Sequence, residues 1–399
     1  MNSDVQFDNI LVFAPPWGLI KHRPHHLMRA IIKSSRGKVL YIEDTAMGAY
    51  RAWLRFWSIV RKVEPRLFVM KSFKLIPYQS KISWAPRINM RIFAFAVRLV
   101  SKIMGLRNVV LWHWSCQSHE YTGMLGEKLV VYDSVCETSL FSWTTPEIRA
   151  MERELLRKSD LAFAATEPLR QIAAVDNPDT YLVSQAVDWD YFEKASEKTG
   201  GKPAELASLK GPIIGFTGNI HEWLDGTTLR VCAQKKPEWQ IILIGPVRNI
   251  GETQKEIAKI RDLDNVHLLG AKPYDQLPRY VAWFDVCIIP YRLNKTTLVS
   301  ETVKFYEYLA TGKPIVSTAL PPLKRWSDVV YLADSPEEFI ECIEKALQEP
   351  PSSAARRRQL ARENTWDARA QTAIKLIQDA WVRKYGPSPS EKSRHARLP

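Results

Sequence analysis

The chain has 399 residues, of which 46% are hydrophobic and 25% charged, and 56 Lys and Arg against 43 Asp and Glu give a formal net charge of +13. This length and composition are typical of a folded chain of two to three domains and exclude a fibrous or wholly disordered protein. The N-terminus carries no basic and apolar leader, and no uncharged stretch reaches about 18 apolar residues, so we expect neither secretion nor a membrane span.

Short apolar runs recur through the first half of the chain, and the intervals between them are long enough for helices. The runs lie at residues 10–14, 39–42, 109–112, 129–132 and 161–164. Alternation of this kind predicts parallel strands joined by helical crossovers. We therefore expect residues 1–192 to form a doubly wound, Rossmann-like domain.

The positive charge is concentrated between residues 51 and 107, where thirteen basic residues face the single acid Glu64. Two stretches of this segment read as amphipathic helices with basic faces: one contains Arg51, Arg55 and Lys62, and the other Arg87, Arg91, Arg98 and Lys102. Basic helices rich in Trp, Phe and Ile suit the surface of an anionic membrane. The alternatives are packing of the apolar faces on a sheet, with solvated cations outside, and nucleic-acid binding, for which no recognisable motif is present.

A polar, Gly-containing stretch follows Phe192, and residues 193–210 are predicted to be a linker. A second series of apolar runs starts after it, at 213–216, 241–244, 266–269, 286–289 and 315–317, with helices expected at 253–261 and 336–347. This pattern predicts a second doubly wound domain over residues 211–364. The Pro-rich tail at 386–399 is expected to be disordered. Five widely spaced cysteines without a CxxC pair favour a reducing, cytoplasmic setting and no zinc site.

The run ending at Pro290 is followed by a loop, a helix, the glycine Gly312 and another apolar run. Ser300 is a candidate N-cap, and a helix that begins there offers free backbone N–H groups to a diphosphate. Lys304 lies in the first turn, where a cation is unfavourable unless an anion is close, and Glu307 follows one turn later. A carboxylate there can accept hydrogen bonds from sugar hydroxyls. The alternative is an ordinary Lys304–Glu307 surface pair before a C-cap at Gly312.

Residues 304–318 (KFYEYLATGKPIVST) resemble the donor-site signature of GT-B glycosyltransferases similar to family 4. The segments at 215–225, 240–246, 265–278, 284–290 and 185–192 are similar to other motifs of that family, in the same order and spacing. In the N-terminal half, residues 16–27 and 131–136 are similar to a bacterial branch that includes teichuronic-acid-type transferases. Residues 365–385 resemble the helix that crosses back onto the N-terminal domain.

The resemblance implies a GT-B fold, with two Rossmann-like domains and a cleft between them. It implies an acceptor on the N-terminal domain, a nucleotide-sugar donor on the C-terminal domain, transfer without a metal or other cofactor, and retention of configuration. Donor contacts are expected from Gly218, Asn219, Arg248, Arg292, Thr297, Ser300, Glu301, Lys304 and Glu307.

Four motifs depart from the family pattern. The family's paired glutamates are eight residues apart, which places the first at Val299, whereas Glu301 is offset from it. Its basic pair after the Gly-rich loop falls at Asn219 and Trp223, so Lys304, Arg292 and Arg248 are expected to meet the phosphate charge instead. Its "YDxxD" motif ends here in Cys136, and Gln185-Ala186 replaces the usual Asn-Gly.

On the acceptor side, Trp17, Gly18, Arg23 and His25 follow the first predicted strand and are candidate acceptor contacts. His26 and Asp133 are candidate general bases for a sugar hydroxyl, together with Glu307 as a catalytic group of the donor side. The alternative for the histidines is a structural, hydrogen-bonded role.

The sequence thus predicts a glycosyltransferase that acts on a lipid-linked or membrane-proximal glycan in surface-polysaccharide synthesis. We expect a cytoplasmic enzyme, peripheral at the inner face of an anionic membrane, with no nucleic-acid partner. A sugar-nucleotide 2-epimerase of the same fold and a non-catalytic basic scaffold that binds lipid or nucleic acid are the alternatives.

Overall fold

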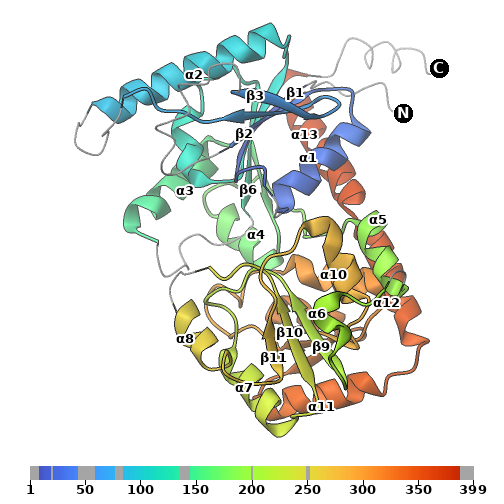
Figure 1. Cartoon of the computed structure of the whole chain (residues 1–399). Coiled ribbons are helices and arrows are strands. Elements are labelled where there is room, and N and C mark those ends of the chain that lie inside the picture. The colour runs from blue at the N-terminus through green and yellow to red at the C-terminus, as the bar shows by residue number, and fades with distance from the viewer. Residues whose placement is uncertain are drawn as a thin grey trace, which may run out of the picture. The chain divides into compact units, whose positions relative to one another are not determined.

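The chain folds into two compact units in the computed structural model, which describes residues 9–18, 21–43, 59–76, 84–134, 144–198, 201–248 and 252–386. The first unit contains the described residues up to Val183 and returns with Arg369, while the second is Ser184–Ala368. Figure 1 shows an α/β arrangement in each. Residues 387–399 of the predicted tail and part of the basic segment, including Arg51 and Arg55, lie outside the described residues.

The first unit is built on one sheet in the order β3-β4-β2-β1-β5-β6-β7-β8, parallel except for the β3–β4 pair. Its strands are β1 Asn9–Ala14, β2 Val39–Glu43, β3 Val60–Glu64, β4 Leu67–Lys71, β5 Val109–His113, β6 Leu129–Ser134, β7 Leu161–Ala164 and β8 Thr180–Leu182. Its helices are α1 Arg23–Ser34, α2 Ala85–Ile103, η3 Cys116–Tyr121, α3 Pro146–Lys158, α4 Glu167–Ala174 and most of α13 Trp366–Tyr385. The central strands are buried throughout, as parallel strands covered on both faces require.

The second unit has a six-stranded parallel sheet in the order β11-β10-β9-β12-β13-β14. Its strands are β9 Ile213–Thr217, β10 Gln240–Ile244, β11 Val266–Leu268, β12 Val286–Ile289, β13 Ile315–Thr318 and β14 Tyr331–Ala333. Its helices are α5 Trp189–Phe192, η5 Glu193–Ser196, α6 Ala204–Ala207, α7 Gly226–Lys235, α8 Thr253–Ala258, η6 Tyr274–Gln276, α9 Leu277–Val281, α10 Val303–Thr311, η7 Pro321–Trp326, α11 Pro336–Leu347 and α12 Ser353–Glu363. Hydrophobic clusters cover both faces of this sheet.

Strand order reverses direction at β9 in this sheet, because β10 and β11 lie on one side and β12 to β14 on the other. Loops after strands on either side of such a reversal leave a crevice at the carboxyl ends, where ligands bind in open α/β sheets. A ligand site is therefore expected among the loops after β9, β10 and β12.

Two predictions about chain organisation need correction. The segment 193–210 is not a free linker, because Ala195 and Leu206 are buried in the core of the second unit and the boundary falls at Val183. Lys62 does not lie on a helix: residues Val60–Glu64 pair antiparallel with β4 at the edge of the sheet. Edge strands carry charged residues on an exposed side, which mimics the charge pattern of an amphipathic helix.

The prediction of an amphipathic helix over Arg87–Lys102 is met by α2, whose four basic residues are all exposed. Among the described residues, no helix has both the length and the apolar character that crossing a membrane requires.

Candidate functional site

Two glycines bring the ends of β9 and β10 against each other. Gly218 and Gly245 have φ values of +154° and +156°, which side chains disfavour, and a Cβ on Gly245 would lie 1.7 Å from the Gly218 oxygen. A Cβ on Gly218 would lie 3.2 Å from Cε of Lys304. The bare backbone at Gly218 therefore gives room for the Lys304 side chain, and the Gly-rich loop and α10 form one site.

Helix α10 begins at Val303, and Thr302 is its N-cap, with Oγ1 accepting from the Lys304 N–H over 3.3 Å. The prediction of Ser300 as the cap is wrong because the Ser300 N–H donates to the Thr296 carbonyl and closes the preceding turn. The first turn of α10 still presents backbone N–H groups and the positive end of the helix dipole. Gly312 ends the helix in the left-handed conformation, as expected for a C-cap glycine.

Lys304 and Glu307 form a close ion pair, with 2.7 Å between Nζ and Oε2. The Glu307 side chain is 1% exposed, whereas that of Lys304 is 18% exposed. This is a partly buried pair rather than the solvated surface pair that the spacing alone allows. Lys304 lies between the carboxylate and solvent, so a ligand at the start of α10 meets the ammonium group first.

Two tyrosines, the buried Tyr308 and the partly buried Tyr291, connect α10 to the strands. The Thr217 N–H at the end of β9 donates to the Tyr308 hydroxyl over 2.8 Å. The pKa of Tyr291 is raised to about 12, mainly by burial. The negative charge of Glu307 raises this pKa further, and a hydrogen bond with Thr302 opposes the rise. Tyr291 thus lies beneath the first turn of α10, and both phenols are neutral at physiological pH.

Of the remaining predicted cations, Arg248 lies beside the Gly-rich loop and Arg292 is already engaged. The Arg248 backbone N–H donates to the Ile220 carbonyl, and the positive charge of the Arg248 side chain is one of the causes that lower the pKa of His221. The Arg292 guanidinium binds the buried carboxylate of Glu256 at 3.3 Å. Thr297 donates its hydroxyl to the Arg292 carbonyl and is 5% exposed, so it holds the loop and is not presented to a ligand.

The loop after β9 holds several polar atoms without a partner. Asn219 Oδ1, His221 Nδ1 and Trp223 Nε1 are buried and make no hydrogen bond to the part of the chain that the structure describes. The His221 and Trp223 rings stack at 4.1 Å, and burial is the main cause that lowers the pKa of His221. Buried polar atoms are nearly always satisfied, so three such atoms in one short loop indicate a place where a polar ligand or water binds.

Two further unpaired oxygens precede α10. Ser300 Oγ and Glu301 Oε2 are buried and have no hydrogen-bond partner among the described residues, while Glu301 Oε1 accepts from Arg325 over 2.7 Å. Burial raises the pKa of Glu301. The structure thus brings Gly218, Asn219, Ser300, Lys304 and Glu307 to the carboxyl edge of one sheet, where the donor was predicted.

In the first unit, Arg23 at the start of α1 reaches Asp133 at the end of β6. The Arg23 Nε–H lies 3.1 and 3.0 Å from the two Asp133 oxygens, and the two side chains are 1% and 0% exposed. Asp133 is therefore the partner of a buried guanidinium instead of a free base, and Arg23 is not a surface contact for an acceptor.

The predicted acceptor histidines are also buried. His25 is 0% exposed: its Nδ1 accepts from the His22 N–H, and its Nε2 lies 3.1 Å from the Tyr41 hydroxyl. Burial lowers the pKa of His25 to about 3, so the ring is neutral. His26 is 4% exposed. The structure supports the structural alternative for both histidines, and neither is presented to an acceptor hydroxyl.

Trp17 and Gly18 are the predicted acceptor residues that stay accessible. The Trp17 ring packs edge-on against His25 and Tyr41 at 4.9 and 5.0 Å, and Lys21 lies over it at 5.0 Å. Gly18 is exposed, and its carbonyl accepts from Lys21. Arg29 also lies over the partly buried Trp17 ring, at 5.4 Å, so two cations contact this ring.

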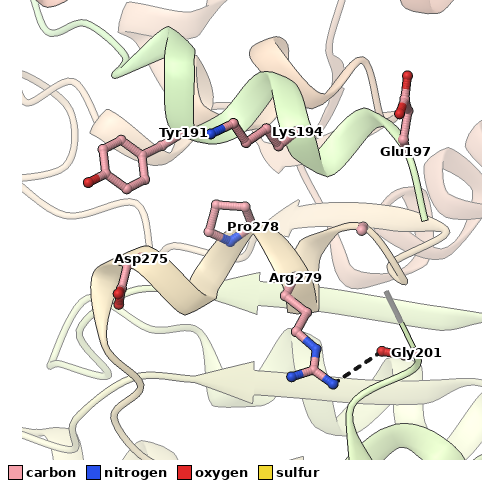
Figure 2. A pocket seen from close by; sticks show the side chains of 8 residues that line it. Tyr191, Lys194, Glu197, Gly201, Asp275, Pro278 and Arg279 are labelled. Carbon is pink, nitrogen blue, oxygen red and sulfur yellow. Dashed lines mark hydrogen bonds between the residues drawn. The ribbon is translucent and has the colours of Figure 1, made fainter. Parts of the chain in front are cut away.

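Two cavities among the described residues lie away from the predicted donor residues. One, of about 450 Å³, separates α5 and η5 from α9, and Figure 2 shows Tyr191, Lys194 and Glu197 on one wall and Asp275 and Arg279 on the other. Its cations are matched by acids, and Arg279 donates to the Gly201 carbonyl. It contains no predicted donor residue. A second, of about 320 Å³, lies beside α3 and α4 in the first unit.

Three residues of the donor side were not predicted as ligand contacts. His221 and Trp223 carry unpaired polar atoms, and Tyr291 supports α10 from below. At position 223 the family resemblance shows only that Trp223 replaces a basic residue. The one signal in the sequence for His221 and Trp223 is their His-x-Trp spacing, which begins two residues after Asn219.

Comparison with known proteins concerns the family of the second unit and the fold of the chain. Residues 211–349 match the family model described as glycosyl transferases group 1. The chain is 27% identical over 232 residues to the putative teichuronic acid biosynthesis glycosyltransferase TuaH of Bacillus subtilis (strain 168). This match covers 55% of the chain and 57% of that protein, so the chain spans a little over half the length of this relative.

Solved structures show the same fold over nearly the whole chain. Sucrose-phosphate synthase from Thermosynechococcus elongatus has a TM-score of 0.71 at 14% identity, with 94% of this chain and all of that chain covered. Anabaena HepE in complex with UDP and glucose has a TM-score of 0.64 at 14% identity, over 92% and 98%. The α,α-trehalose-phosphate synthase (UDP-forming) from Burkholderia xenovorans has a TM-score of 0.65 at 11% identity, over 93% and 100%. The predicted GT-B fold is confirmed.

Proposed function

We propose that this protein transfers a sugar from a nucleotide-diphosphate sugar to an acceptor hydroxyl, since residues 211–349 match the model of glycosyl transferases group 1 and the chain has a GT-B fold. The observation that carries the proposal is the position of Lys304. Its side chain crosses Gly218 at the first turn of α10, so an ammonium group, bare loop backbone and free helix N–H groups lie together. This combination suits a diphosphate.

Charge stabilisation is the proposed chemistry of this site. Breaking the bond between the sugar and the diphosphate leaves negative charge on the leaving phosphate oxygens. Lys304 and the dipole of α10 are fixed in place before that charge develops, which lowers the barrier without later reorganisation. Arg248 adds a second positive charge beside the same loop. We expect metal-independent transfer with retention of configuration, as the family resemblance implies.

Glu307 is proposed to recognise the donor's hydroxyl groups once Lys304 turns to the phosphate. Its carboxylate is held by Lys304 at 2.7 Å and the Glu307 side chain is 1% exposed. A diphosphate competes for the ammonium group and leaves Glu307 able to accept from a vicinal diol. The unpaired atoms of Asn219, His221 and Trp223 are proposed as further polar contacts to the donor.

The proposed acceptor is a lipid-linked or membrane-proximal glycan in surface-polysaccharide synthesis, at the cytoplasmic face of an anionic membrane. Two observations support this. The relative from Bacillus subtilis is named for teichuronic acid biosynthesis. The segment between Arg51 and Arg107 carries nearly all of the excess positive charge of the chain. Trp17 and Gly18, which are accessible at the end of β1, are the proposed acceptor contacts.

A donor screen tests the proposal. UDP-, GDP-, dTDP- and CMP-sugars are added to the purified chain, and a rise in the unfolding temperature identifies the nucleotide by mass action. The Kd of that donor is then measured by calorimetry for the wild type, Lys304→Ala and the matched control Lys345→Ala, which removes an exposed lysine from α11. Loss of a charged hydrogen bond should weaken binding about 10- to 100-fold in Lys304→Ala only.

Two results would contradict the proposal. Absence of binding to every nucleotide sugar would favour the non-catalytic scaffold. Binding followed by epimerisation of the donor, with no transfer to any acceptor, would favour the 2-epimerase.

A further inference from the structure

Helix α2 carries an apolar stripe on its outer side. The stripe follows a repeat of three or four residues and consists of Trp84, Ile88, Ile92, Phe95, Leu99 and Ile103. At about 100° per residue these side chains fall within one arc of the helix. Phe95 is 67% exposed and Ile103 77%, and Trp84, Ile88 and Leu99 are also exposed. Large apolar side chains gathered in this way mark an interaction site, whereas single ones are ordinary.

The opposite side of α2 is already used for packing. Phe93 and Val97 are buried in the core of the first unit, together with residues of β1, β2 and β4. Asn89 Oδ1 accepts hydrogen bonds from the Leu75 and Ile76 N–H groups of the preceding loop, at 2.9 and 2.8 Å. The helix is therefore fixed to the unit, and the stripe is a second apolar face and not the one that drives folding.

A row of cations borders the stripe. Arg87, Arg91, Arg98 and Lys102 are all exposed, and α2 contains no acidic residue. On the helical wheel they lie along one flank of the apolar arc. Figure 1 shows α2 as a long cyan helix at the rim of its unit. Its outer side thus offers about 22 Å of apolar ridge between Ile88 and Ile103, at 1.5 Å per residue, with four positive charges beside it.

We infer that this face of α2 is a membrane-docking surface, on which the helix lies parallel to an anionic bilayer. The apolar stripe enters the boundary between head groups and acyl chains, and the cations contact anionic lipid head groups. Trp84 at the end of the stripe suits the head-group level. The inference rests on the proposed function in one respect, that an acceptor at a membrane requires the enzyme there, and it names the surface that meets the lipid.

Charge selects the bilayer over other occupants. In a dimer through α2, the stripes of two copies would meet and bring two uncompensated basic rows close together, which is unfavourable. Nucleic acid would satisfy the cations but leave Phe95, Leu99 and Ile103 in water. An anionic bilayer satisfies both parts of the face, because its charge lies at the surface and its apolar region directly below.

Vesicle co-sedimentation tests the inference with the full chain. Vesicles of phosphatidylcholine with phosphatidylglycerol are compared with vesicles of phosphatidylcholine alone, at low and high salt. The wild type should bind the anionic vesicles, more strongly at low salt. Arg91→Glu/Arg98→Glu and Phe95→Asn/Leu99→Asn should each reduce the partition coefficient by about tenfold or more, since each cation near the surface contributes about fivefold and a buried Phe or Leu at least as much.

Matched controls separate the surface from bulk charge and hydrophobicity. Lys210→Glu/Lys345→Glu makes the same charge change on exposed residues of the second unit, and Val175→Asn removes a side chain that is 84% exposed at the end of α4. Both should sediment like the wild type. As a second readout, brominated lipids should quench wild-type Trp fluorescence more than that of Trp84→Phe. All changes are on exposed side chains, so equal unfolding temperatures are expected and are checked.

The outcomes distinguish this inference from the proposed function. Equal loss of binding in the control variants, or unchanged binding in both α2 variants, would overturn it. So would a change from dimer to monomer in Phe95→Asn/Leu99→Asn without any loss of vesicle binding, which would assign the stripe to a second copy. A chain that binds vesicles through α2 but no nucleotide sugar would overturn the proposed function and leave this surface standing.

Discussion

Replacing Asp133 by Asn should destabilise the chain instead of only stopping catalysis. The Arg23 Nε–H binds both Asp133 oxygens, at 3.1 and 3.0 Å, and both side chains are essentially without solvent contact. The substitution leaves a guanidinium charge buried beside a neutral amide. Removing one member of such a pair costs about 3–5 kcal/mol, a large part of the 5–15 kcal/mol by which a typical domain is stable.

The assay is urea unfolding followed by circular dichroism, for the wild type, Asp133→Asn, Arg23→Met and the double variant Arg23→Met/Asp133→Leu. Both single variants should unfold at clearly lower urea concentration. The double variant should recover most of the loss, because an apolar pair of similar volume has no charge to desolvate. Donor affinity should be unchanged, since both residues belong to the first unit. An Asp133→Asn variant with wild-type stability and no transfer activity would refute this reasoning and restore Asp133 as a base.

Three further outcomes are expected. Gly218→Ala should weaken donor binding about tenfold and cost about 1–3 kcal/mol of stability, measured by calorimetry and urea unfolding, because its Cβ would lie 2.9 Å from the Phe216 ring and 3.2 Å from the Lys304 side chain at a φ of +154°. An unchanged donor affinity would show that this loop is not part of the donor site. Gly312→Ala, at a φ of +73°, should cost about 1–2 kcal/mol in urea unfolding and leave the donor Kd unchanged; a weaker donor Kd would contradict this. Burial lowers the pKa of His25 and of His113 from 6.5 to about 3, so their contribution to stability is complete above pH 6.5 and is lost as the pH falls toward 3, by about 1.4 kcal/mol per pH unit for each histidine. The urea midpoint should therefore fall less steeply with decreasing pH in His25→Gln than in the wild type. An equal slope in the two proteins would refute the assignment of a neutral, buried His25.

The central strands of both sheets were predictable because their chemistry is simple. Parallel strands covered on both faces are short, continuous apolar runs, and β1, β6, β9 and β12 all have this form. Edge strands are different. β3 has the sequence VRKVE with exposed Arg61 and Lys62, so its alternation of charged and apolar residues is also compatible with a helix.

The donor side was largely predictable, since its parts are close in sequence to strand ends. Lys304 and Glu307 are one helical turn apart, and Gly218 follows a strand, so local patterns place each of them. The sequence could not show that Arg292 is held by Glu256, because that contact joins a loop to helix α8, 36 residues away. It also placed the N-cap of α10 two residues early, at Ser300 instead of Thr302, since Ser and Thr both serve as N-caps.

The acceptor side was predicted less well, because burial is a property of the folded unit and not of a motif. Arg23, His25, His26 and Asp133 follow strand ends, as ligand contacts do. The structure pairs Arg23 with Asp133, 110 residues away, and encloses His25 beside Tyr41. A polar residue at a strand end can either bind a ligand or complete the core, and only its long-range partners distinguish the two roles.

Covalent labelling tests the position of the donor most directly. The nucleotide sugar selected by the screen is replaced by a photoreactive analogue that carries its reactive group next to the diphosphate, and the labelled peptides are identified by mass spectrometry. We predict label on peptides that contain residues 215–223 and 297–307, suppressed by the natural donor. Label that instead falls on residues 191–201 and 275–282, the walls of the cavity in Figure 2, would contradict the assignment of the diphosphate to Lys304 and the start of α10.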